Sequence, residues 1–144
     1  MAPSPKTRIM AFGTFDILHQ GHLNLFKQAR ALAENPFLIV SVARDFNVKK
    51  IKGRPPSLTE KQRLAEIKNC RLVDKVVLGG LKNHVPHILK QKPQIIALGY
   101  DQSAYVNNLG KTLEKRGLKV KIARLKAFRP KIYKSSLFKA IKVD

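Results

Sequence analysis

GTFDILHQGH, residues 13–22, lies between a short apolar run at 8–12 and a run with apolar residues at helical spacing, 22–33. Its histidines, His19 and His22, are three residues apart, and residues at that spacing share one face of a helix. Backbone N–H groups at a helix N-terminus favour bound anions. Gly13 and Gly21 lack a Cβ and allow sharp turns and close approach of the backbone to a ligand. The stretch therefore predicts a nucleotide phosphate site between a first strand and a first helix.

Apolar runs and helical patterns alternate along the rest of the chain, with a polar, basic loop expected at 44–56. Ser57-Leu-Thr-Glu60 has the form of a capping box and predicts the start of a helix. The expected strands are 8–12, 37–43, 75–78, 94–98 and 118–125, and the expected helices are 22–33, 57–69, 85–91, 103–116 and a last one ending near 141. Short apolar strands separated by helices indicate an α/β fold, a single doubly wound, Rossmann-like domain with a five-stranded parallel sheet. We expect it to span 1–144, with 1–7 as a flexible extension and ligands bound beyond the carboxyl ends of the strands.

The charge and hydropathy of the chain limit the classes of molecule that it can bind. The formal net charge is +20, from 29 Lys and Arg against 9 Asp and Glu, and such a field attracts polyanions non-specifically. Trp is absent, so the aromatic platforms that stack single-stranded bases are scarce. No apolar run approaches the ~20 residues of a membrane span, and the N-terminus lacks the apolar segment of a secretory signal. We expect a cytoplasmic protein with no membrane partner.

The motif context resembles that of the cytidylyltransferase-like nucleotidyltransferases, whose signature is His-x-Gly-His after the first strand. Within that superfamily the chain is most similar to the archaeal-type FAD synthases. The likeness runs from about 8 to 141, and the stretches that carry it are 13–19, 42–45, 48–54, 73–79 and 96–102. At 129–134 the chain reads Arg-Pro-Lys-Ile-Tyr-Lys, without the glycine that related cytidylyltransferases have there. That departure puts the closing of this last loop in doubt.

The resemblance implies attack by a phosphate oxygen of FMN on the α-phosphorus of ATP, with release of pyrophosphate and help from a divalent cation, Mg²⁺. The alternative acceptor is glycerol 3-phosphate or a similar sugar phosphate, with CTP as donor; the choice between ATP and CTP stays open. A second alternative is a non-catalytic RNA-binding protein that uses the basic surface. Members of the family often form dimers, so a homodimer is a further expectation.

The resemblance also assigns roles to residues. His19 and His22 would donate hydrogen bonds to the triphosphate, and a lysine after the second strand, Lys49 or Lys52, would reach the α-phosphate; the alternative is a solvated basic loop. Further nucleotide contacts would come from the ends of the strands and from two helices: Gly13, Thr14, Phe15, Gly21, Arg63, Gly99, Asp101, Arg129, Ser135 and Ser136.

Four positions carry explicit alternatives. Arg63 could instead be an ordinary surface charge on its helix. Asp16 would hold Mg²⁺ or orient a donor, and its alternative is a carboxylate that bonds loop backbone. His84 and His87 could suggest a zinc pair, but no acidic or cysteine cluster accompanies them, so surface or boundary histidines are the better interpretation.

Overall fold

A five-stranded parallel sheet forms the centre of the computed structural model, which describes residues 5–80, 84–100, 102 and 108–127. The strands are β1 (Thr7–Gly13), β2 (Pro36–Val42), β3 (Lys75–Leu78), β4 (Ile95–Leu98) and β5 (Lys121–Arg124), in the order β3-β2-β1-β4-β5. β1 lies at the centre, and its neighbours run parallel to it with Ile9 opposite both Leu38 and Ile95. The predicted fold class is confirmed. The order reverses between β1 and β4, which places the switch point, where such folds bind ligands, at the ends of these two strands.

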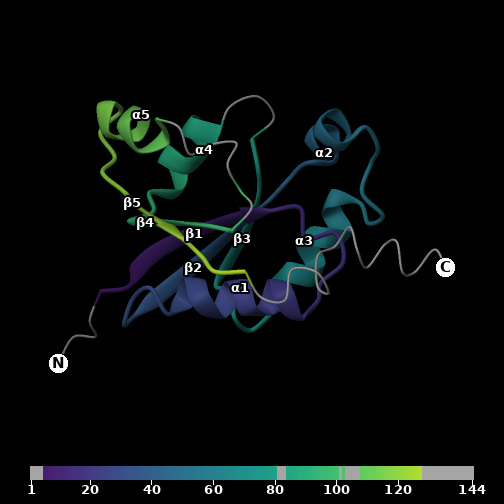
Figure 1. Ribbon diagram of the computed structural model, residues 1–144, viewed down its shortest axis with the longest axis horizontal. Helices are drawn as coiled ribbons and strands as arrows, with labels where there is room; N and C mark the ends of the chain where they lie inside the picture. Colours follow the sequence, from purple (N-terminus) through teal and green to yellow (C-terminus); the bar gives the residue numbers. More distant parts are fainter. Residues whose placement is uncertain (1–4, 81–83, 101, 103–107, 128–144) are drawn as a thin grey trace.

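Helices cover both faces of the sheet (Figure 1). Helices α1 (Gln20–Arg30) and α3 (Glu60–Lys68) pack on one face, and α4 (His84–Gln91) and α5 (Leu109–Lys115) pack on the other. Neighbouring strand residues point to opposite faces, so Ile9 joins the core under α1 while Met10 joins the core under α4 and α5. This explains why the strands read as continuous apolar runs.

The predicted loop at 44–56 is wrong in part, because it contains a helix, α2 (Asp45–Lys52). Only Val48 of this helix is buried, and its other large apolar residues, Phe46 and Ile51, are exposed. The helix ends at Gly53, whose φ of 80° is left-handed, a conformation that glycine adopts without strain. The first residue of α2, Asp45, donates its backbone N–H to Glu60, which lies fifteen positions further along the chain. A local sequence pattern cannot reveal such a partner.

The capping box of α3 is shifted by two residues from the predicted Ser57 and Glu60. Thr59 caps the helix by accepting from the backbone N–H of Gln62, and the Gln62 side chain accepts from the backbone N–H of Thr59. The chain offers two overlapping Ser/Thr-x-x-Glu/Gln patterns here. The first is not used as a cap because Glu60 contacts α2 and the Ser57 N–H donates to Asp16.

The end of α5 is as predicted. Gly117 has a φ of 90°, and the Leu118 N–H donates to the Leu113 carbonyl, which closes the helix in a Schellman-type turn. The expected start of this helix at 103 and the final helix near 135–141 lie outside the described residues. Among the helices that are described, none combines the length and hydropathy required to cross a bilayer.

Candidate functional site

His19 begins α1. Its extended backbone (φ −146°, ψ 178°) makes it the N-cap, and its Nδ1 accepts the Gly21 N–H at 3.0 Å. Burial lowers its pKa, so the ring is neutral at neutral pH. A neutral imidazole has one donor and one acceptor nitrogen. Because Nδ1 is the acceptor, the proton of the neutral ring is on Nε2, which makes Nε2 the hydrogen-bond donor of His19.

His22 stacks on His19 with ring centroids 3.8 Å apart and an interplanar angle of 25°. Its pKa falls to about 3, first because burial disfavours the charged ring and then because of the neighbouring His19, while a hydrogen bond to the Ile17 backbone opposes the shift. Both imidazoles are therefore neutral in the protein alone. The predicted pair is together, but it carries no positive charge, and the one N–H of the neutral His22 ring already donates to the Ile17 backbone.

Phe15 packs against His22 of this pair. It is 4% exposed and contacts the edge of His22, with centroids 5.2 Å apart, as well as Phe26 at 5.3 Å. A Cβ on Gly13 would lie 2.6 Å from the Phe15 ring. The packing of Phe15 thus leaves no space for a side chain at residue 13. Phe15 itself is a core residue that orients His22.

Asp16 is 1% exposed and its two carboxylate oxygens accept the backbone N–H groups of Ser57 and Leu58, each at 2.8 Å. This agrees with the alternative interpretation of Asp16 as a carboxylate that bonds loop backbone, although the bonded backbone belongs to another loop than its own. Its burial favours this interpretation over a cation ligand, because a bound ion would have to reach a carboxylate that is 1% exposed. No group of three or more His, Cys, Asp or Glu that could hold a metal ion occurs within the described part of the chain.

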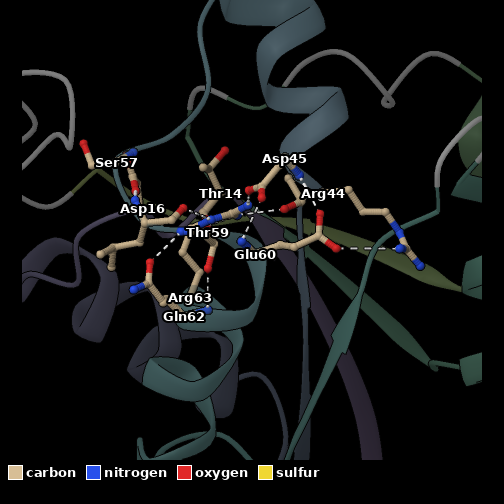
Figure 2. A network of polar contacts seen from close by, with 11 residues as sticks. Thr14, Asp16, Arg44, Asp45, Ser57, Thr59, Glu60, Gln62 and Arg63 are labelled. Carbon is tan, nitrogen blue, oxygen red and sulfur yellow. Dashed lines mark hydrogen bonds and ion pairs between the residues drawn. The ribbon is translucent and has the colours of Figure 1, made fainter.

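Arg63 lies at the centre of a polar network that joins three segments (Figure 2). It is 0% exposed, so the interpretation as a surface charge is wrong. Its guanidinium donates to three backbone carbonyls and pairs with a carboxylate: Thr14 O at 2.8 Å, Ala43 O at 2.7 Å, Leu58 O at 3.2 Å and Asp45 Oδ1 at 2.6 Å. The expected nucleotide contact is therefore replaced by a buried cross-link between the loop after β1, the end of β2 and the start of α3.

The two helices that follow β2 cap each other. The Asp45 N–H donates to Glu60 Oε1 at 3.0 Å, and the Glu60 N–H donates to Asp45 Oδ2 at 3.1 Å. Glu60 also lies 3.8 Å from Arg44. The network thereby sets where α2 starts relative to His19 and His22. The side chains of Lys49 and Lys52 extend from this helix and are exposed.

At the switch point, the described loop residues after β4 are held by side chains that the sequence analysis did not single out. The Gln102 carboxamide contacts both Phe12 and Gly99, and Arg124 of β5 donates to the carbonyls of Gly99, Tyr100 and Gln102. A lone glutamine and an edge-strand arginine have no spacing signature. Of the other predicted contacts, Gly21 lies in the first turn of α1, whereas Asp101, Arg129, Ser135 and Ser136 lie outside the described residues.

His84 and His87 are half-buried on α4. His87 Nε2 lies 2.8 Å from the hydroxyl of the buried Ser41, and His84 contacts the edge of Phe12. Burial lowers the pKa of both rings. They pack α4 onto the sheet, as the interpretation of boundary histidines predicts.

Comparisons with known proteins place this geometry in context. A family model described as cytidylyltransferase-like matches residues 10–141. The FAD synthase of Korarchaeum cryptofilum is 48% identical over 122 residues, which are 84% of this chain and 82% of that protein. The FAD synthase of Methanosarcina barkeri is 45% identical over 120 residues, 83% of each. The crystal structure of the lipopolysaccharide core biosynthesis protein from Thermoplasma volcanium superposes with a TM-score of 0.78 at 37% identity, covering 86% of this chain and 99% of that one.

Proposed function

The chain belongs to the cytidylyltransferase-like family, and from this we propose that it is a nucleotidyltransferase that adenylates FMN to FAD. The identity of 44–48% to curated FAD synthases over most of both chains is the observation that carries the choice of substrates. The stacked pair His19 and His22 at the start of α1 supports the phosphate chemistry.

In the proposed reaction a phosphate oxygen of FMN attacks the α-phosphorus of ATP, and the bond to the oxygen that bridges to the β-phosphorus breaks. Pyrophosphate leaves with that oxygen. The substrate phosphate is the nucleophile, so the protein contributes placement and stabilisation of charge. The Nε2–H of His19 is oriented for this by the Gly21 cap, and His22 is held against it by Phe15.

Because both imidazoles are neutral, other groups must neutralise the negative charge of the triphosphate. We assign this role to Lys49 and Lys52, two of the exposed cations of α2. Gly99, Asp101, Arg129, Ser135 and Ser136 remain the proposed contacts for the rest of the nucleotide. Thr14 and Arg63 position the loop, since the guanidinium of Arg63 holds the Thr14 carbonyl.

Mg²⁺ is not assigned to a protein ligand, because the Asp16 carboxylate is already used by backbone donors. Phosphate oxygens are themselves good Mg²⁺ ligands, so we propose that the cation enters with the triphosphate, and no step is assigned to it. A homodimer and non-specific binding of polyanions stay predictions that the reaction itself does not need.

A substrate matrix tests the proposal. Purified protein is incubated with ATP or CTP and with FMN or glycerol 3-phosphate, while pyrophosphate release is followed and FAD is measured by chromatography. We expect turnover with ATP and FMN only, and its loss in a His22→Ala control. Turnover with CTP and glycerol 3-phosphate would favour the alternative acceptor. RNA binding with steep salt dependence and no pyrophosphate would favour the non-catalytic alternative.

A further inference from the structure

The side-chain amide of Gln102 stands between the ends of β1 and β4. Its Oε1 accepts the Gly99 N–H at 2.8 Å, and its Nε2 donates to the Phe12 carbonyl at 2.6 Å. A carboxamide carries a donor and an acceptor like a peptide group. Gln102 thus joins the two strands with one bond to each.

The register of the sheet shows what this amide replaces. Pairing of β1 with β4 runs Ile9↔Ile95, Met10↔Ile96 and Ala11↔Ala97 and then stops. Continued by two residues, the same parallel ladder would bring Gly13 opposite Gly99 and the Phe12 carbonyl onto the Gly99 N–H. These two groups are the ones that Gln102 bonds. The amide is therefore inserted where the next backbone bond would form, and it bridges the two groups that this bond would join.

Arg124 of β5 bonds the backbone that follows β4. One of its guanidinium nitrogens donates to the carbonyls of Gly99 at 2.9 Å, Tyr100 at 3.3 Å and Gln102 at 2.8 Å. The Gln102 N–H also donates to the Gly99 carbonyl at 3.1 Å. The backbone at Gly99 and Gln102 is thus fixed by bonds to β1 on one side and to β5 on the other.

We infer that Gln102, supported by Arg124, is a positioning residue that sets the width of the crevice between β1 and β4, and hence how the nucleoside part of the substrate triphosphate is bound. The inference rests on the proposed function, because it takes ATP as the ligand of this crevice. The carboxamide opens the sheet at the switch point, where ligands of doubly wound folds bind. Its loss would let Gly99 bond Phe12 directly and narrow the opening.

The test separates the two substrates. In Gln102→Ala we expect the KM for ATP to rise by about tenfold or more, because small displacements of positioning groups are costly, while the KM for FMN stays within about twofold. Binding of a non-hydrolysable ATP analogue, measured by calorimetry, should weaken by the same factor. Arg124→Met should shift the same constants in the same direction, and it provides a second variant should Gln102→Ala fail to fold.

Gln28 of α1 offers a control of matched chemistry that contacts neither Gly99 nor Phe12. Its carboxamide also bonds backbone through both polar atoms, donating to the Lys126 carbonyl at 2.9 Å and accepting the Lys126 N–H at 2.8 Å. Gln28→Ala should lose stability without changing the KM for ATP. Unchanged ATP constants in Gln102→Ala, or an equal rise for both substrates, would overturn the inference. If the wild-type protein makes no FAD, the proposed function fails instead, so the two failures are distinguishable.

Discussion

Replacement of Arg63 by methionine should be among the most destabilising single changes in this protein. The variant keeps much of the apolar stem but removes the guanidinium. It leaves the carbonyls of Thr14, Ala43 and Leu58 without the donor they have now. A buried polar group that loses its partner costs about 1–3 kcal/mol, and breaking a buried ion pair costs about 3–5 kcal/mol.

These costs are not additive. The Asp45 side chain is 37% exposed and can be rehydrated when its partner is lost, which reduces its share. We therefore expect the free energy of unfolding to fall by about 3–5 kcal/mol, a large part of the 5–15 kcal/mol typical of a domain. At a urea m-value of about 2 kcal/mol per M, the unfolding midpoint would fall by about 2 M.

Urea unfolding followed by far-UV circular dichroism measures this change. The exposed Arg71 provides the control, since Arg71→Met should stay within about 0.5 kcal/mol of the wild type. Arg63→Lys keeps the charge but cannot reproduce the planar fork, so it should recover only part of the loss. A loss below about 1 kcal/mol in Arg63→Met would refute the assignment of Arg63 as a buried cross-link.

Three further predictions concern the site. His22→Ala should keep the circular dichroism spectrum but lose on the order of 10²–10³ in pyrophosphate release, because it removes one of the two imidazoles proposed to contact the triphosphate; wild-type turnover would contradict its role. The pKa of His22 is lowered to about 3 in the folded protein from 6.5, so the unfolded chain takes up the proton first. The stability that the neutral His22 ring contributes is complete above pH 6.5 and is lost as the pH falls toward 3. The loss reaches about 2 kcal/mol at pH 5. Urea unfolding at pH 7.5 and pH 5 should show this extra loss in the wild type relative to His22→Asn, and equal losses would exclude it. Asp16→Asn should cost about 1–3 kcal/mol by turning an acceptor into a donor against backbone N–H groups, while the Mg²⁺ concentration for half-maximal activity stays unchanged; a shift in that concentration would make Asp16 a metal ligand after all.

The sequence predicted what depends on local pattern. Apolar runs and helical spacing were sufficient to predict the five strands and α1. The motif at residues 13–22 was sufficient to predict that His19 and His22 lie together. The Gly117 turn was also predictable, because glycine has a distinctive backbone preference. Each of these features depends on residues that are neighbours in the chain.

What could not be predicted depends on partners far apart in sequence. Asp16 looks like a metal ligand until Ser57 and Leu58 are seen to bond both of its oxygens. Arg63 looks like a surface charge until four groups from three segments are seen to surround it. Polar residues in a single sequence do not indicate whether they face solvent or a buried carbonyl, and that difference decides their role.

The reciprocal bonds between Asp45 and Glu60 have a consequence for engineering. Residues 45–60 form an excursion whose two ends are bonded to each other at its base. The turn at 53–55 within this excursion is exposed, and lengthening a flexible turn costs only about 0.6 kcal/mol for each doubling. A reporter peptide or an affinity tag grafted at this turn would lengthen the excursion and leave the sheet in place.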